Sequence, residues 1–179
     1  MEKIVVNDTN VFIDLFNVGL LEEFFSLPWE IHTTDFVMHE LLREGQKETV
    51  ERFVADGRLH VPVFDSKELS EIASLFQHYA NRTNLSMTDC SVWYYAKAHQ
   101  YVLLTGGRKL RAVSVYDGVD VHGVIHVFDS LVASDIVTPR EAAEKLKHLC
   151  DVNPRLPKDE INRRLGAWQK EEDCVQESV

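Results

Sequence analysis

The sequence is short of the features that mark secreted and membrane-bound proteins. Its 179 residues include three widely spaced cysteines, Cys90, Cys150 and Cys174, and no Cys-x-x-Cys pair. This number and spacing predict neither a disulfide framework nor a zinc knuckle. No apolar run is long enough to cross a bilayer, and the first residues lack the basic and apolar regions of a signal peptide. We therefore expect a cytoplasmic protein with no membrane partner.

Positive charge is also scarce. The chain has 19 Lys and Arg residues against 29 Asp and Glu residues, which gives a formal net charge of −10. Phosphate affinity comes mainly from Lys and Arg, so this balance argues against a general polyanion binder. It leaves room for a nuclease, because metal-binding carboxylates add negative charge and basic groups can be concentrated locally. Surplus acid also keeps a protein soluble without any partner.

Short apolar runs alternate with segments of helical periodicity over the first 133 residues. The expected strands are 4–6, 31–34, 59–64, 101–105 and 119–121, and Pro62 predicts that the strand 59–64 lies at an edge of the sheet. The expected helices are 10–25, 36–44 with Asp35 as its cap, a polar helix that continues to Ala55, 66–81, 86–99 and 108–115. This order predicts an α/β fold, a three-layer α/β/α sandwich with a parallel sheet. Ligands bind such sheets at the carboxyl ends of the strands.

The character of the sequence changes after Val132. Thr138-Pro139 predicts the start of a helix that runs to about Cys150, and a last helix is expected over 158–168. We expect an α/β domain over residues 1–133 and a helical extension packed on it over residues 134–169. Residues 170–179 are expected to form a flexible acidic tail.

Three acids lie at the end of an expected strand or early in an expected helix. Asp8 follows the strand 4–6, Glu40 lies beside Leu41 on the apolar side of its helix, and Asp89 lies three residues after Ser86. Each has a structural alternative to a role in a site. Asp8 can cap the next helix, and Ser-Met-Thr-Asp is a capping-box pattern. Together, however, the three acids are expected at one edge of the sheet.

Carboxylates gathered at one place need a counter-charge. They repel one another, and burial raises their pKa values. A divalent cation removes this penalty, and oxygen ligands select Mg²⁺ or Mn²⁺ over Zn²⁺. The hypothesis is therefore a Mg²⁺ or Mn²⁺ ion at Asp8, Glu40 and Asp89, where it lowers the pKa of a bound water and stabilises charge on a phosphodiester oxygen.

Several segments, in consistent order, resemble the motifs of PIN domains. Residues 6–15 (VNDTNVFIDL) resemble the opening motif, 36–42 (FVMHELL) the second acidic motif, and 85–89 (LSMTD) with the strand 102–106 (VLLTG) the third motif and the strand after it. The resemblance covers about residues 3–132. It implies a PIN-like domain over residues 1–133, with an α/β/α sandwich fold.

Many PIN domains are Mg²⁺- or Mn²⁺-dependent ribonucleases, including toxins of toxin–antitoxin pairs. The resemblance implies catalytic and metal-ligand roles for Asp8, Glu40 and Asp89, and supporting roles for Asn10 and Thr105. The implied function is a metal-dependent endoribonuclease. The implied partners are an RNA substrate and an antitoxin-like protein. A homodimer is a further expected partner, since the C-terminal helices could form a dimer contact.

One position departs from the family pattern. PIN domains usually carry a fourth acid just after the Thr-Gly of that last strand, where this chain has Gly107. Glycine supplies no ligand, so a two-metal site is weakened unless Asp117 or Asp120 compensates. Just beyond it, Arg108, Lys109 and Arg111 are candidates for contacts with RNA phosphates. Their structural alternative is a solvated helix face.

Two other functions of an Asp at the end of a strand in an α/β fold are disfavoured by the sequence, and a third stays open. A phosphatase with an Asp-x-Asp nucleophile is disfavoured because the sequence reads Asp8-Thr9-Asn10. A nucleotide-binding fold is disfavoured because no Gly-x-Gly-x-x-Gly or Walker loop is present. A catalytically weakened module that binds RNA or protein stays open, since Gly107 favours it and the three retained acids speak against it.

Overall fold

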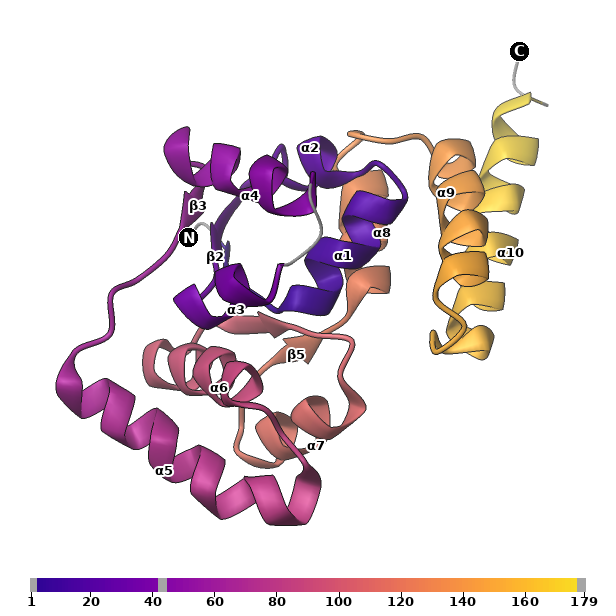
Figure 1. Cartoon of the computed structure of the whole chain (residues 1–179). Coiled ribbons are helices and arrows are strands. Elements are labelled where there is room, and N and C mark those ends of the chain that lie inside the picture. The colour runs from indigo at the N-terminus through magenta and orange to yellow at the C-terminus, as the bar shows by residue number, and fades with distance from the viewer. Residues whose placement is uncertain (1–2, 42–44, 177–179) are drawn as a thin grey trace. The chain divides into compact units, whose positions relative to one another are not determined.

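The computed structural model describes residues 3–41 and 45–176 (Figure 1). Among them, five strands form one sheet whose neighbours are all parallel. The strands are β1 (Lys3–Asn7), β2 (Trp29–His32), β3 (Leu59–His60), β4 (Val102–Leu104) and β5 (Val121–His122). Their order across the sheet is β3-β2-β1-β4-β5. The expected α/β fold class with a parallel sheet is confirmed.

The central strand is β1, which pairs with β2 on one side and β4 on the other. Its Val5 and Val6 are fully buried, as are Leu103 and Leu104 of β4. Parallel strands that are covered on both faces read as continuous apolar runs, and these segments have that form. Such runs therefore identify the middle of the sheet from the sequence.

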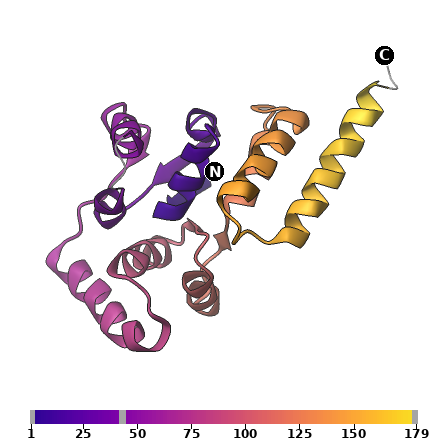
Figure 2. The same ribbon diagram turned by 45° about the vertical axis from the view of Figure 1, so that its right-hand side comes forward.

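The chain divides into two compact units, the first of which holds the sheet. This first unit comprises Met1–Ile13 and Pro28–Gly123. Its helices are α3 (Asp35–Glu40), α4 (Gln46–Ala55), α5 (Ser66–Thr83), α6 (Met87–His99) and α7 (Arg108–Tyr116). Helix α6 packs on β1 and β4, and α5 runs alongside α6 (Figures 1 and 2).

The second unit comprises Asp14–Leu27 and Val124–Val179. Helix α1 (Thr9–Asn17) crosses from the first unit into the second, which also holds α2 (Leu21–Phe24), α8 (Val124–Ala133), α9 (Pro139–Val152) and α10 (Lys158–Gln176). Residues 14–27 and 124–133 thus group with the C-terminal helices. Packing of residues 134–169 on the α/β domain stays a prediction.

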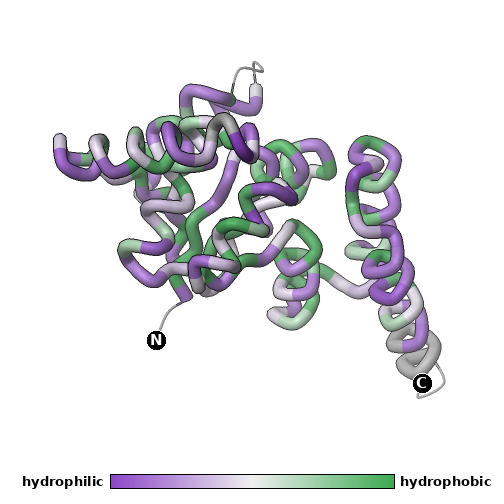
Figure 3. The backbone as a smooth tube through the Cα atoms, turned by 90° about the horizontal axis from the view of Figure 1, so that it is seen from below, coloured by the Kyte–Doolittle hydropathy of each residue, from purple (hydrophilic) through white to green (hydrophobic). Residues whose placement is uncertain are grey.

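Helices α9 and α10 lie side by side (Figures 1 and 2). Hydrophobic residues alternate with hydrophilic ones along this pair (Figure 3). The buried residues of α9 are Ala142, Leu146 and Leu149, whose spacing puts them on one face of the helix. In α10, the Arg164 Nε donates to both carboxylate oxygens of Asp129 at 3.1 Å, and its Nη2 donates to Oδ2 at 2.8 Å. Apolar packing and this bidentate pair therefore stabilise the second unit.

Several expected boundaries were wrong. The expected helix 10–25 is two helices, α1 and α2, because Gly19 adopts a φ of +65° between them. The expected cap Asp35 is the first residue of α3, while Thr34 is the N-cap and accepts from the Val37 backbone N–H at 3.4 Å. The part of the expected helix 36–44 beyond Leu41 lies outside the described residues.

The strand expected over 59–64 is only two residues long in β3, which lies at the edge of the sheet as Pro62 predicted. The last strand is shifted from 119–121 to Val121–His122. Helix α8 was not predicted, although His126, Asp129 and Ser130 are spaced so as to form a polar stripe on an otherwise apolar segment. Helix α10 continues to Gln176, well beyond the expected end at Trp168.

None of the helices in the described ranges 3–41 and 45–176 combines the length and the apolar character that a membrane span requires.

Candidate functional site

The strand order changes direction at β1. From β1 the chain proceeds outward to β2 and β3, and it then returns to the other side of β1 as β4 and β5. Loops after β1 and β4 therefore leave the sheet in different directions, and ligands of open α/β sheets bind at such a switch point. Asp8 follows β1, and its backbone N–H donates to the Leu104 carbonyl of β4 at 3.0 Å. The switch point of this sheet is therefore at Asp8.

The Asp8 carboxylate is buried, at 3% exposure, and is oriented by three donors. Its Oδ2 accepts from the Thr105 hydroxyl at 2.6 Å and from Asn10 Nδ2 at 2.8 Å. Its Oδ1 accepts from the Thr9 backbone N–H at 2.8 Å. A buried charge requires such partners. The bonds hold the carboxylate in one orientation and leave a lone pair on Oδ1 for a ligand.

Asn10 and Thr105 also bind the loop after β4. Asn10 Oδ1 accepts from the Gly106 N–H at 2.7 Å, and Thr105 Oγ1 accepts from the Gly107 N–H at 2.9 Å. A Cβ on Gly106 would lie 3.1 Å from Asn10 Oδ1, so the close approach favours glycine there. The structure thus places both expected supporting residues in contact with Asp8.

Glu40 is the last residue of α3 and is exposed. Its Oε2 accepts from the Thr9 hydroxyl at 2.8 Å. Thr9 therefore bridges two of the predicted ligands, since its N–H binds Asp8 and its hydroxyl binds Glu40. Sequence reasoning missed Thr9. The signal that identifies it is a hydroxyl residue directly after an acid at a helix start.

Asp89 takes the structural role that its spacing predicted. Its Oδ2 accepts from the Ser86 N–H at 2.8 Å, and its own N–H donates to the Ser86 hydroxyl at 3.0 Å. This capping box begins α6 and fixes the Asp89 side chain. The box uses Oδ2, so Oδ1 is compatible with a second role as a ligand.

The charges of Asp89 and Glu40 act on Asp8. Burial, together with the negative charges of Asp89 and Glu40, raises the pKa of Asp8 to about 6, against the opposing hydrogen bonds from Thr105 and Thr9. A cation near these carboxylates would offset this cost. The donor set consists of oxygen atoms, which fits a hard ion such as Mg²⁺ or Mn²⁺.

The ligand atoms of the three carboxylates do not form a compact group. Among the described residues, one group of three His, Cys, Asp or Glu side chains has its ligand atoms within 4.8 Å of one another, and it is Glu30, His32 and His60. Asp8, Glu40 and Asp89 are not such a group, so at least one pair of their ligand atoms lies farther apart than 4.8 Å. Their roles as metal ligands stay a prediction.

Gly107 is the N-cap of α7 and supplies no capping side chain. The acids considered as replacements for a fourth ligand are bound elsewhere. Asp117 pairs with Lys97, and Asp120 lies 3.0 Å from His122 Nε2. The charges that act on Asp8 are those of Asp89 and Glu40. The structure thus brings neither replacement to Asp8.

The three basic residues after Gly107 differ in their surroundings. Arg108 and Lys109 are exposed in the first turn of α7. The Arg111 guanidinium instead donates to the backbone carbonyls of Val121 at 2.9 Å and Thr105 at 3.1 Å. Arg111 therefore stabilises the ends of β4 and β5, while Arg108 and Lys109 are available to a partner.

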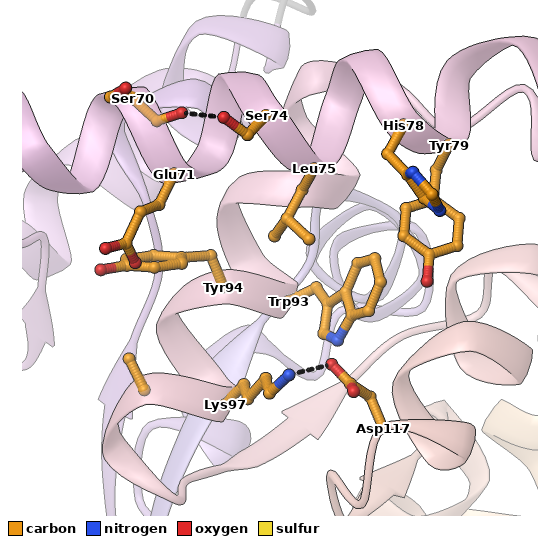
Figure 4. Close-up of a pocket in the computed structure, with 11 residues that line it drawn as sticks. Ser70, Glu71, Ser74, Leu75, His78, Tyr79, Trp93, Tyr94, Lys97 and Asp117 are labelled. Atoms are coloured by element: carbon orange, nitrogen blue, oxygen red, sulfur yellow. Dashed lines mark hydrogen bonds and ion pairs between the residues drawn. The ribbon is translucent and has the colours of Figure 1, made fainter.

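A hollow of about 670 Å³ lies between α5 and α6 (Figure 4). Trp93, Tyr94 and Glu71 line it, and the Lys97–Asp117 pair forms one side. The Trp93 indole N–H lies in this wall and has no hydrogen-bond partner within the described part of the chain. The hollow contains none of Asp8, Glu40 and Asp89, so it is separate from the candidate site.

Comparisons with known proteins agree with this architecture. A family model described as "PIN domain" matches residues 4–170. The crystal structure of PAE2754 from Pyrobaculum aerophilum has a similar fold, with a TM-score of 0.51 and 18% identity over 74% of this chain and 99% of that one. Comparison with curated protein sequences gave no match.

Two further crystal structures are more distant. VapBC2 from Rickettsia felis, bound to a DNA fragment from its promoter, has a TM-score of 0.47 and 16% identity over 67% of this chain and 98% of that one. FitAcB from Neisseria gonorrhoeae has a TM-score of 0.44 and 17% identity over 68% and 99%.

Proposed function

Because the chain belongs to the PIN-domain family, whose members are generally nucleases, we propose that it is a divalent-metal-dependent endoribonuclease that hydrolyses RNA phosphodiester bonds. The observation that supports this most directly is the state of Asp8. A buried carboxylate at the switch point of the sheet, with two further acids acting on it, is costly without a cation. Carboxylates with strongly raised pKa values are characteristic of functional sites.

The proposed roles follow from the contacts. Asp8, Glu40 and Asp89 would hold Mg²⁺ or Mn²⁺, and the bound ion would lower the pKa of a water and stabilise charge on the phosphodiester. Thr105 and Asn10 orient the Asp8 carboxylate by donating hydrogen bonds to its Oδ2. In the reaction, the water oxygen bonds to phosphorus, the bond from phosphorus to the leaving sugar oxygen breaks, and a proton from the water ends on that sugar oxygen.

Substrate binding is assigned to the start of α7. Arg108 and Lys109 are exposed there, and Thr105, three residues before Arg108, contacts Asp8. Each phosphate contact by a basic residue adds to the salt dependence of binding. Arg108→Ala and Lys109→Ala should each reduce the slope of log affinity against log salt by about 1. Arg111→Ala should instead lower stability, since its guanidinium binds two backbone carbonyls.

The test is cleavage of a panel of RNAs in Mn²⁺ by the full chain and by Asp8→Asn and Asp89→Asn. Both variants should lose metal-dependent cleavage by at least about a hundredfold, because each removes a ligand charge. Asp151→Asn is the matched control, since Asp151 is an exposed acid of α9. Cleavage at the wild-type rate by either site variant would show that the assignment is wrong.

A second function is favoured by Gly107. Without a fourth acid at the N-cap of α7, the fold can serve as a catalytically weakened module that binds RNA or a protein. Isothermal titration with Mn²⁺ separates the two functions. Binding that Asp8→Asn abolishes supports the nuclease, whereas RNA binding without any Mn²⁺ binding supports the module. An antitoxin-like partner, a homodimer and a cytoplasmic location stay predictions.

A further inference from the structure

Two strands at one side of the sheet bring a second set of metal-ligand side chains together. Glu30 and His32 are two residues apart on β2, so their side chains point to the same face of the sheet. His60 of β3 is the register partner of His32, and the two imidazole rings have centroids 4.9 Å apart. One ligand atom from each of the three side chains lies within 4.8 Å of the other two.

We propose that Glu30, His32 and His60 form a binding site for a transition-metal ion, with Zn²⁺ as the expected ion. Two imidazoles and one carboxylate are a ligand set that zinc uses with a fourth position left open. Imidazole nitrogen favours Zn²⁺ and its neighbours in the first row over Mg²⁺. The chemistry of this site therefore differs from that of the oxygen-only set at Asp8.

The spacing of the ligand atoms is close to what a single ion requires. Ligand atoms on one tetrahedral zinc ion, at bonds of about 2.1 Å, lie about 3.4 Å apart. His32 Nε2 and Glu30 Oε1 are 2.7 Å apart, and no pair in the group exceeds 4.8 Å. To bind one ion, the distance between His32 Nε2 and Glu30 Oε1 has to increase slightly. The distances from these two side chains to the ligand atom of His60 have to decrease by at most about 1.4 Å. Rotation of the exposed His60 side chain supplies such a change.

His32 already has the outer contact that a metal-bound histidine needs. Its Nδ1 lies 2.9 Å from the hydroxyl of Tyr95, a residue of α6 that is 6% exposed. Ligating histidines donate their second ring N–H to an oxygen acceptor, usually a carboxylate, a backbone carbonyl or water, and the Tyr95 hydroxyl oxygen can take that place and fix the ring and the tautomer. Tyr95 thus orients Nε2 toward Glu30 and the space beside His60.

The site is open to solvent on one side. The His32 side chain is 9% exposed and that of Glu30 is 37% exposed, while His60 is an exposed residue of the edge strand. An ion can therefore enter from water, and a water molecule can complete its coordination. Because β3 has only two residues, an ion shared by β2 and β3 would bind the edge strand to the sheet and raise its stability.

The two candidate sites are distinct in position. Tyr95, beneath His32, and Asp89 are six residues apart in α6, which corresponds to about 9 Å along the helix axis. The rival explanation of the group is packing, since His32 also lies against the Tyr101 ring at 5.4 Å. Packing alone predicts no affinity for a metal ion, so the two explanations are separated by a binding measurement.

The experiment is calorimetric titration of tag-free, chelator-treated full chain with ZnCl₂, followed by titration with Co²⁺ monitored by visible absorption. We expect one Zn²⁺ per chain and the intense absorption of tetrahedral Co²⁺. His60→Ala should weaken binding by about tenfold or more, and it is suited to the test because the side chain is exposed. Glu30→Gln should weaken binding as well. His148→Ala, an exposed histidine of α9, is the matched control and should bind normally.

Three results would overturn the proposal. The first is the absence of Zn²⁺ binding to the wild-type chain. The second is binding that His60→Ala leaves unchanged. The third is binding that Asp8→Asn abolishes and His60→Ala does not, because the ion would then occupy the carboxylate site. The proposal does not depend on nuclease activity, so its outcome is separate from that of the cleavage test.

Discussion

Asp8 should make the metal-free protein less stable as pH rises toward neutrality. The pKa of this carboxyl is raised from 3.8 to about 6 in the folded chain, chiefly by burial and then by the charges of Asp89 and Glu40. A carboxyl with a raised folded-state pKa contributes stability that is fully present below its unfolded pKa. That contribution is lost as pH rises through the folded pKa.

The size of the effect follows from the shift. The difference between about 6 and 3.8 is about 2.2 pKa units, which at 1.36 kcal/mol per unit is about 3 kcal/mol. Asp8→Asn removes the titration. The amide also replaces one acceptor oxygen among the bonds from Thr105, Asn10 and Thr9, but this cost is the same at every pH. The part of the stability difference that changes with pH is therefore caused by the charge of Asp8.

The assay is urea denaturation of the wild type and of Asp8→Asn at several pH values between 4 and 7, with a chelator present. The free energy of unfolding of the wild type, minus that of the variant, should fall by about 2.4 kcal/mol across this range, because the unfolded carboxyl, with a pKa of 3.8, is already mostly ionised at pH 4 and the rest of the effect lies below that pH. Asp14, whose pKa is also raised to about 6, titrates in both proteins and cancels. Asp151→Asn is the control for loss of an exposed charge.

A difference between wild type and Asp8→Asn that stays constant from pH 4 to pH 7 would refute this reasoning. The carboxylate would then be as well solvated when folded as when unfolded. Addition of Mn²⁺ at pH 7 extends the test. If the acids bind the ion, Mn²⁺ should stabilise the wild type and leave Asp8→Asn unchanged.

Three further predictions concern single contacts. Gly107→Asp should tighten Mn²⁺ binding or raise the rate of cleavage. Gly107→Asn is its control, because asparagine caps the helix without adding a charge. If both variants behaved alike, a fourth acid would not be what the site lacks. Ser86→Ala should lower the free energy of unfolding by about 1 kcal/mol in urea, because the Asp89 N–H loses its acceptor; an unchanged value would contradict a stabilising cap. Asn153→Ala removes the Nδ2 donor that binds the two oxygens of the Asp14 carboxylate at 3.0 and 3.1 Å. Urea denaturation should show a larger loss in the free energy of unfolding at pH 7, where Asp14 is charged, than at pH 4. Equal losses at both pH values would argue against this bond.

Local signals in the sequence were sufficient for several parts of the fold. The apolar run of β1, the capping box at Ser86 and Asp89, and the edge position predicted by Pro62 each depend on residues that are close in the chain. Helix boundaries were less predictable, as the expected helix 10–25, which Gly19 divides, and the missed α8 show. Propensity and capping act over a few residues, whereas packing selects among the structures they allow.

By itself, the sequence determined the α/β order of the elements, the three acids and the absence of a fourth acid at Gly107. Only the tertiary structure decided which donors hold those acids. Thr105 donates a hydrogen bond to Asp8, which is 97 residues away in the sequence, and Thr9 donates one to Glu40, which is 31 residues away. The pairing of His32 with His60 likewise depends on the register of β2 and β3. Strand register and order result from the packing of the whole sheet, so contacts between its strands cannot be read from local pattern.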